Sequence, residues 1–457
     1  MPTRGCRYYE CQSMARGPWE KGMPMRFIGK PMLSILVLTA LAAGNAFCRK
    51  WSGDFICGTP HEPDALAKIA DLPTIPKVYS GKSVAIMVKI AFSDAPYTVT
   101  DSTINESHAT INNLYQAMSR NTFQFDFKIH SEVWTAPGTK AQYGANFNSL
   151  RYFIGTKLKE NGYVKGTNYT VYVANFPSIE VPWDGLSNGP GNGGNYINGS
   201  YSAGVMSHEL GHALGLPPAP SIEAGADMFG TPGTTGQHVE YGNVYDVMGG
   251  AEGLGHFNVN YKWRTGWIDK EEAIEVRNTG VYRLYAQDNP VHKGRLLGIR
   301  VPSVDTRYAY WLEYRTVSTS ARLGAAVMFE GFQGAHSRGI HLLDMTPGSR
   351  TSGDAQDAVL VPGKEFTDKY GTAIFKTFAI NTGVWNEEGW VDLQVTIPGS
   401  IPVSLARNSR IQQAMHPGEF QAFNIMGRAM GFALPAQALV VKSNNGKLGL
   451  AQAPSLM

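Results

Sequence analysis

The residues His208-Glu209-Leu210-Gly211-His212 have the types and the spacing to bind a metal ion and activate a water molecule. On a helix, positions i and i+4 lie one above the other, so His208 and His212 can direct two imidazole nitrogens at one ion. Glu209 lies beside them and is placed to take a proton from the water that the ion polarises. Zinc lowers the pKa of a bound water to about 7, so hydroxide is available at neutral pH. The pattern predicts hydrolysis, with His208 and His212 as metal ligands and Glu209 as general base.

A helix must carry this motif, and its glycines indicate where the helix ends. Gly211 and Gly215 each weaken a helix by about 1 kcal/mol relative to alanine. Gly215 is best explained as a helix stop, because glycine readily adopts the left-handed conformation that terminates helices. A sharp turn at Gly215 is what would swing a third ligand back onto the metal.

At this point the sequence resembles a known family. His208-Glu-x-x-His212-x-x-Gly215 resembles the zinc motif of the metzincin clan of endopeptidases, and Val239–Gly249 resembles the clan's methionine turn, with Met248 as its methionine. Together with 255–268, these segments are similar to the gametolysin-like secreted peptidases, over about residues 83–270. The resemblance implies a two-lobed catalytic domain with zinc on the central helix. It also implies that Met248 packs beneath the metal without binding it.

The chain departs from the family pattern at Pro218, where the clan has its third ligand, usually His and sometimes Asp. Proline has no donor atom, so the third ligand is unassigned. His238 is the best substitute by type, because neutral imidazole suits zinc, and Glu223 and Asp227 are near enough in the sequence to loop back. A second interpretation is a degenerate relative that binds metal weakly or not at all. A third is a natural variant whose activity is low but real.

The N-terminal residues predict export. Residues 25–30 are basic, 31–43 are apolar, and 44–46 are small, which is the order found in a secretory signal peptide. The apolar run is short for a membrane span. We therefore interpret 1–46 as an N-terminal extension with a signal peptide, and the proline-rich stretch 47–80 as a linker or short pro-segment. The mature protein is expected to be secreted or at the cell surface, without a stable membrane span.

All four cysteines lie within the first 57 residues, so the catalytic region has no disulfide framework. Cys48 and Cys57 either pair in an exported protein or stay as two thiols. Cys57 is the one upstream residue with any claim to be a cysteine-type latency switch, although nothing in the sequence places it at the zinc.

Residues 81–271 are expected to form the catalytic domain, with a mixed sheet and helices packed on it. Hydrophobic periodicity predicts strands at 83–92, 123–130 and 169–174, and helices at 103–119 and 150–161. The glycine-rich stretch Gly185–Gly194 is expected to be a rim or edge-strand loop of the cleft. Trp183 and Asp184 lie where they could shape substrate access, although ordinary loop packing explains them more simply.

From residue 272 the pattern changes to short alternating runs between turns, which predicts a β-sandwich-like domain over 272–400. Residues 401–457 are expected to form a small C-terminal β module, a possible sorting signal, with Asn445-Gly446 at a hairpin turn. The fold class expected is α+β, a metzincin-like catalytic domain followed by an all-β sandwich-like region. Calcium is a possible second cofactor, although solvated turns explain its candidate ligands more simply. Those candidates are Asp344, Asp354, Asp357 and Asp368.

The chain has 457 residues, and its net charge of +3 gives no argument for a nucleic-acid partner. Our main hypothesis is a secreted zinc-dependent endopeptidase acting on a protein or peptide substrate. The alternative is a catalytically degenerate pseudo-peptidase that acts as an extracellular binding or surface protein. A third hypothesis, an adhesin or carbohydrate-binding β region, has no specific sequence feature behind it.

Overall fold

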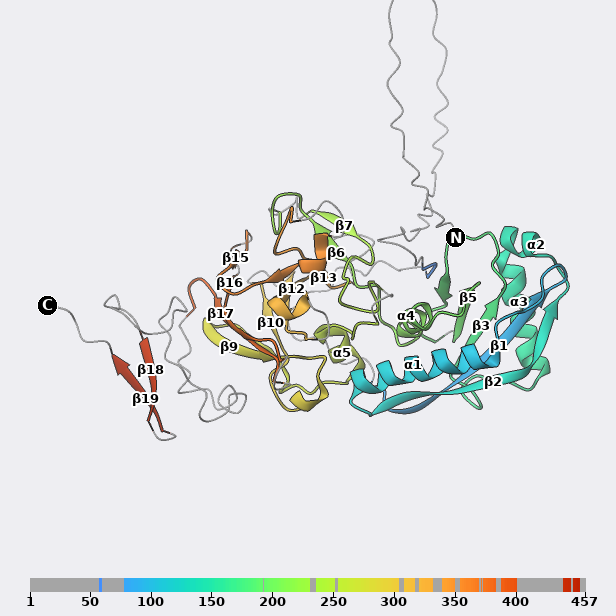
Figure 1. Cartoon of the computed structure of the whole chain (residues 1–457), viewed down its shortest axis with the longest axis horizontal. Coiled ribbons are helices and arrows are strands. Elements are labelled where there is room, and N and C mark those ends of the chain that lie inside the picture. The colour runs from blue at the N-terminus through green and yellow to red at the C-terminus, as the bar shows by residue number, and fades with distance from the viewer. Residues whose placement is uncertain are drawn as a thin grey trace, which may run out of the picture. The chain divides into compact units, whose positions relative to one another are not determined.

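The structure is a computed structural model, and Figure 1 shows its elements in chain order. The expected signal peptide, most of the expected linker and most of the C-terminal module lie outside the described residues. Within the described part, no helix has both the length and the apolar character that a membrane crossing requires. The described residues are 57–59, 78–191, 193–230, 236–250, 254–303, 308–316, 320–331, 339–349, 354–369, 371, 373–383, 388–400, 439–444 and 447–452.

The first sheet is mixed, as expected, with the strand order β2-β1-β3-β5-β4. β1, β2, β3 and β5 run parallel, and β4 pairs antiparallel with β5 at one edge of the sheet. The glycine-rich stretch thus begins with an edge strand, and its last glycine starts another strand. The strands are β1 (Gly81–Phe92), β2 (Phe123–Ala136), β3 (Val171–Phe176), β4 (Gly185–Ser187) and β5 (Gly194–Asn198).

Helices cover both faces of this sheet, because successive strand residues point to opposite sides. Ala85 and Met87 of β1 share a hydrophobic cluster with α1 and α4, whereas Ile86 and Val88 share another with α3. The α1/α4 side therefore holds the helix with the metal motif (Figure 1). The helices are α1 (Asp101–Ser119), α2 (Lys140–Ala145), α3 (Phe147–Glu160), α4 (Ala203–Ala213) and α5 (Val259–Thr265).

A second sheet takes strands from both sides of residue 272. Its order is β7-β6-β13-β12-β11-β10-β8, with β14 paired to β12. β6 and β7 come from the chain between α4 and α5, so the segment after the metal motif is hydrogen-bonded into this sheet. The division of the chain into domains at 271 stays a prediction. The strands are β6 (Ser221–Glu223), β7 (Gln237–Val239), β8 (Ala273–Glu275), β10 (Gly298–Pro302), β11 (Ala309–Glu313), β12 (Ala325–Glu330), β13 (His341–Leu343) and β14 (Val359–Leu360).

A third sheet, in the order β15-β16-β17-β9, shares one hydrophobic cluster with the second. Leu312 and Phe329 of the second sheet belong to the same cluster as Leu284, Phe375 and Leu393 of the third. The chain is therefore an α+β protein with several sheets and few helices. The remaining elements are β9 (Gly280–Tyr285), β15 (Glu365–Thr367), β16 (Ile374–Asn381), β17 (Trp390–Thr396), the antiparallel pair β18 (Leu439–Asn444) and β19 (Lys447–Gln452), and the short 3-10 turns η2 (Pro290–His292), η3 (Ala321–Leu323) and η4 (Asp354–Asp357).

Candidate metal centre

α4 brings the two motif histidines together in a buried place. The helix begins after Ser202, whose side chain accepts a hydrogen bond from the Val205 N–H. One helical turn then separates His208 from His212, and their Nε2 atoms lie 3.0 Å apart. His208 is 0% exposed and His212 is 3% exposed. The spacing predicted from the sequence therefore puts two ring nitrogens at one point.

The backbone fixes which nitrogen of each ring faces that point. His208 Nδ1 lies 2.9 Å from the Val247 carbonyl oxygen, and His212 Nδ1 lies 2.8 Å from that of Leu216. A carbonyl only accepts hydrogen bonds, so each Nδ1 carries the proton and each Nε2 of a neutral ring presents a lone pair. Two lone pairs at 3.0 Å repel unless a cation lies between them. Such backbone bonds are the usual support of metal-binding histidines.

Cys57 supplies a third donor. Its Sγ lies 3.5 Å from His212 Nε2, and Cys57, His208 and His212 are the only described group of three such side chains whose donor atoms all lie within 4.8 Å of one another. A tetrahedral zinc with bonds of about 2.05 Å to nitrogen and about 2.3 Å to sulfur puts nitrogen and sulfur roughly 3.5 Å apart and two nitrogens roughly 3.3 Å apart. The three donors therefore fit a metal ion such as zinc. Cys57 forms no disulfide within the described part of the chain.

The turn after α4 orients the His212 ring. Gly215 has φ +88, the Leu216 N–H donates to the Gly211 carbonyl at 3.1 Å, and the Gly215 N–H donates to that of His212 at 2.8 Å. This is the Schellman arrangement, so Gly215 ends the helix as predicted. The turn carries the Leu216 carbonyl back to His212 Nδ1. The Pro218 carbonyl instead accepts from the Tyr261 hydroxyl at 2.6 Å.

None of the three residues considered as a replacement third ligand belongs to the Cys57 group. His238 lies on β7, and its Nδ1 is 2.9 Å from Nε2 of His341. Glu223 accepts from the Gly225 N–H at 2.7 Å. Asp227 pairs with Lys369 at 2.8 Å. Cys57, which the sequence offered as a latency switch or as a disulfide partner of Cys48, lies where a substitute ligand was expected.

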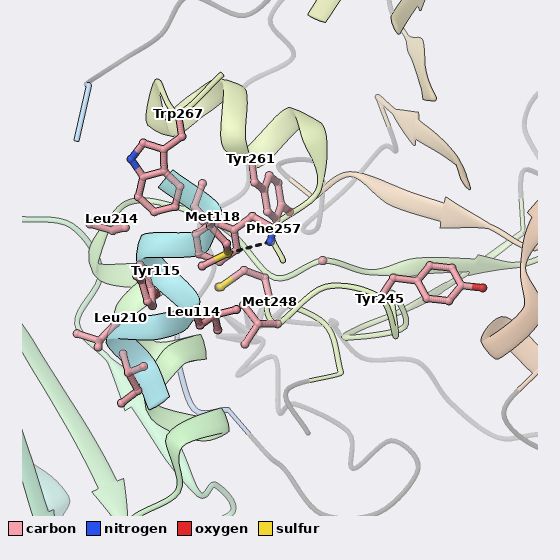
Figure 2. Packing of buried hydrophobic residues seen from close by; sticks show 14 of the residues in the cluster. Leu114, Tyr115, Met118, Leu210, Leu214, Tyr245, Met248, Phe257, Tyr261 and Trp267 are labelled. Atoms are coloured by element: carbon pink, nitrogen blue, oxygen red, sulfur yellow. Dashed lines mark hydrogen bonds between the residues drawn. The ribbon is translucent and has the colours of Figure 1, made fainter. Parts of the chain in front are cut away.

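Met248 packs directly against α4. A Cβ added to Gly211 would collide with Met248 Sδ and would lie 3.4 Å from the Phe257 ring, so only glycine fits at that position of the motif. Figure 2 shows Met248 close to Leu114, Met118 and Phe257. The Phe257 N–H also donates to Met118 Sδ at 3.1 Å. Met248 is thus a core residue in contact with the histidine helix.

Glu209 is completely buried and is held by a residue that sequence reasoning missed. The Thr59 hydroxyl donates to Glu209 Oε2 at 2.9 Å and accepts from the Ser187 N–H at 2.7 Å. Burial raises the pKa of Glu209 well above its ordinary range; the nearby Cys57 sulfur raises it further, and the bond from Thr59 opposes both. Glu209 Oε1 has no hydrogen-bond partner among the described residues. A Cβ on Gly185 would lie 2.5 Å from that oxygen, so glycine makes room for the carboxylate.

Residues 57–59 reach this site by lying along β4. Cys57 forms a parallel bridge with Gly185, and the Gly58 N–H donates to the Gly185 carbonyl at 2.7 Å. Thr59 is 4% exposed and Cys57 is 1% exposed. The segment therefore covers both the donor group and Glu209. The sequence signals this only through Cys57, one of two cysteines in the proline-rich stretch 47–80.

Tyr241 is a second neighbour of the donors that the sequence did not single out. Its ring centroid lies 5.4 Å from that of His208, and its φ of +60 is unusual for a bulky residue. Burial raises the pKa of the adjacent Glu240 to about 7, and a hydrogen bond with Tyr241 opposes this. The structure thus places a bulky residue with an unusual backbone conformation beside His208.

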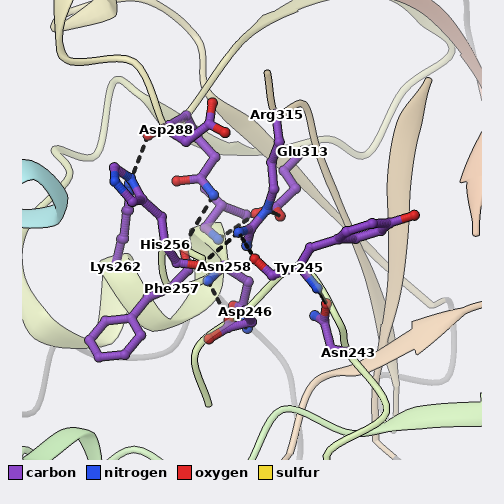
Figure 3. Close-up of polar contacts among 12 residues, drawn as sticks. Asn243, Tyr245, Asp246, His256, Phe257, Asn258, Lys262, Asp288, Glu313 and Arg315 are labelled. Atoms are coloured by element: carbon purple, nitrogen blue, oxygen red, sulfur yellow. Dashed lines mark hydrogen bonds and ion pairs between the residues drawn. The ribbon is translucent and has the colours of Figure 1, made fainter. Parts of the chain in front are cut away.

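A buried polar network supports the segment that carries Met248 (Figure 3). The Asp246 carboxylate accepts from the Met248 N–H at 2.8 Å and the Asn258 N–H at 2.6 Å. Burial raises the pKa of Asp246 to about 6, although Arg315 opposes this. Arg315 of the β region donates to Glu313 at 2.5 Å and to the His256 carbonyl at 2.6 Å. Side chains from the β region thus hold the loop beneath the histidine helix.

The carboxylates considered for calcium have local partners. Asp344 accepts from the Thr346 N–H at 2.8 Å, Asp357 accepts from the Ser349 hydroxyl at 3.0 Å, and Asp368 accepts from the Tyr310 hydroxyl at 2.5 Å. The side chain of Asp354 is outside the described part. A calcium site stays a prediction.

No family model matches the chain, and no curated protein matches it. Among solved structures, that of wild-type OgpA from Akkermansia muciniphila is similar to this chain, with 13% sequence identity and a TM-score of 0.29. The match covers 74% of this chain and 99% of OgpA. A TM-score this low does not establish a shared fold. The function is therefore inferred from the residues of this chain.

Proposed function

We propose that the protein is a secreted zinc-dependent endopeptidase of metzincin type, and that the form with residues 57–59 against β4 is latent. The observation that carries this proposal is the convergence of Cys57 Sγ and two histidine Nε2 atoms beside a buried Glu209. Each histidine is oriented by a backbone carbonyl, as a ligand should be. Zinc, when bound, would supply a water of lowered pKa and polarise the scissile carbonyl.

Glu209 is the residue that would move the proton. Its carboxylate lies beside the donors without being one of them, and its Oε1 is buried and has no partner among the described residues. As general base it would accept a proton from the attacking water and then pass it to the leaving amine. The Thr59 hydroxyl occupies its other oxygen, so Glu209 is engaged while the segment is bound.

Latency follows from burial. The donors and Glu209 are at most 3% exposed while residues 57–59 cover them, so no peptide can reach them. Departure of the segment would free one metal position and Glu209 together. The Met248 segment would then act as the methionine turn, packing beneath the metal site. Which residue completes the metal's ligand set after Cys57 leaves stays unassigned.

Metal content of the purified full chain tests the site. About one zinc per chain is expected in the parent, because three donors fit one ion. His212→Ala is expected to lose most of this zinc. His238→Ala is the matched control and should keep it, since His238 contacts His341 instead. Zinc retained in His212→Ala, or no zinc in the parent, would contradict the proposed centre.

Activity tests the chemistry. Cys57→Ser in the full chain is expected to cleave an unfolded protein substrate in a chelator-sensitive way, and Cys57→Ser with Glu209→Gln is expected to cleave at least about a hundredfold more slowly. The alternative, a pseudo-peptidase, is favoured by Pro218, which cannot supply the family's third ligand. Zinc binding without any cleavage that depends on Glu209 would establish that alternative.

A further inference from the structure

The segment Cys57–Thr59 shows where an extended chain lies in this site. Its main chain is bonded to the edge strand β4 through Gly58 N–H and the Gly185 carbonyl, 2.7 Å apart. Cys57 on one side of Gly58 reaches the histidines, and Thr59 on the other side reaches Glu209. Gly58 is thus between the residue at the metal donors and the residue at the base. A peptide that pairs with the same edge strand in the same register would pass through this position.

Trp183 forms a wall at this position. A Cβ built on Gly58 would lie 2.5 Å from Trp183 Cδ1, 2.6 Å from Cγ and 3.0 Å from Nε1. Real Cβ atoms do not approach other atoms at such distances. The φ of Gly58 lies outside the left-handed region. Glycine is therefore needed here for space and not for backbone conformation.

The Trp183 side chain is fixed in place by its packing and by a hydrogen bond to its backbone. Trp183 is 8% exposed and belongs to the hydrophobic cluster between the sheet and α3. Its ring makes an edge-on contact with Phe147 at 4.8 Å and another with Phe176 at 6.4 Å. Its carbonyl accepts from the Asn198 side chain at 3.0 Å, which fixes the backbone. The indole cannot swing aside without breaking this packing.

We propose that Trp183 makes the subsite beside the metal selective for glycine, so that the substrates are extended peptides with glycine next to the scissile bond. This rests on the proposed peptidase function. The latent segment satisfies the same restriction with Gly58. A larger residue in a substrate would meet the indole as the Cβ of a substituted Gly58 would.

The steric wall is tested first on the full chain, without relying on activity. The readout is the rate at which iodoacetamide labels Cys57, followed on the Cys57 peptide by mass spectrometry. Gly58→Ala should raise the rate about tenfold, because overpacking expels the segment. In a Trp183→Ala background the same change should have little effect, which a double-mutant cycle measures. An unchanged labelling rate in Gly58→Ala, or an equal effect in both backgrounds, would show that Trp183 does not exclude a Cβ at position 58.

The substrate preference is tested with peptides from a digested proteome and the full-chain Cys57→Ser variant. Cut sites should carry glycine beside the cleaved bond, and adding Trp183→Ala should admit alanine and serine there. Cleavage that depends on Glu209 but shows no glycine preference, or the same profile after Trp183→Ala, would refute the subsite and leave the peptidase standing. Absence of cleavage that depends on Glu209 would refute both the peptidase function and the proposed substrate class. The labelling experiment would still show whether Trp183 excludes a side chain at position 58.

Discussion

Gly211 lies in the motif helix, where the sequence alone assigns it only a cost. Glycine weakens a helix relative to alanine, yet a Cβ at this position would collide with Met248 Sδ. Close approach of the methionine to the helix therefore requires a residue without a side chain. Residue type and spacing allowed His208, Glu209 and His212 to be singled out from the sequence. The partner of Gly211 lies far along the chain and is visible only in the structure.

Gly211→Ala should lower the free energy of unfolding by up to about 2 kcal/mol, because an overpacking cost of about 1–3 kcal/mol is set against a gain in helix propensity of about 1 kcal/mol. Urea unfolding followed by circular dichroism measures this. Gly155→Ala is the matched control in α3, where an added Cβ meets nothing within 4 Å. That variant should be stabilised by about 0.5–1 kcal/mol. Equal effects of the two substitutions would refute the close contact with Met248.

At the scale of elements, the long helices and strands could be predicted from the hydrophobic periodicity of the sequence, whereas the short strands could not. The predicted strand at 83–92 and helix at 103–119 correspond to β1 and α1 within two residues at either end. β4, β6 and β7 have three residues each, too few for a period to be read. Cys57 and His212 are 155 residues apart, and no local rule brings them together. The pairing of the two histidines was therefore predictable, while the third candidate donor and the covering segment were not.

The end of α4 carries a prediction at this scale. Gly215→Ala places an alanine at φ +88, which should cost about 1 kcal/mol of stability. It should also weaken zinc binding, because the turn positions the Leu216 carbonyl on His212. Gly162→Ala tests the same strain, since Gly162 ends α3 at φ +73 and lies away from the donors. Competition with a chromogenic chelator should show weaker zinc binding for Gly215→Ala alone; an equal loss in both variants would contradict this account.

At the scale of the molecule, buried charged side chains link the β region to the candidate metal site. Arg315 donates to the carbonyls of Tyr245, before Met248, and of His256, after it. Glu313, the last residue of β11, accepts from the Val259 N–H. Lys262 of α5 lies in the same network. Its Nζ donates to the Gln287 carbonyl at 2.7 Å and lies 3.1 Å from His256 Nδ1 (Figure 3). Stability of the loop beneath the histidines therefore depends on groups from across the chain.

This network predicts how stability changes with pH. Burial lowers the pKa of Lys262 from 10.5 to about 7; the Asp288 charge opposes this and the Arg315 charge adds to it. Between pH 7 and 10 the unfolded chain binds a proton at this lysine that the folded chain does not, so its contribution to the free energy of unfolding rises with pH. From pH 7 to 9.5 the rise should be roughly 2–3 kcal/mol.

Lys262→Met should remove this part of the rise, while Lys159→Met at an exposed position of α3 should leave it unchanged. Urea unfolding of the three proteins at pH 7 and pH 9.5 measures the difference. Comparing each variant with the parent at the same pH cancels the effect of pH on any bound metal. The same pH dependence in the parent and in Lys262→Met would mean that the lysine keeps its proton in the folded chain. The network would then hold a full positive charge beneath the candidate metal site at neutral pH, next to Arg315.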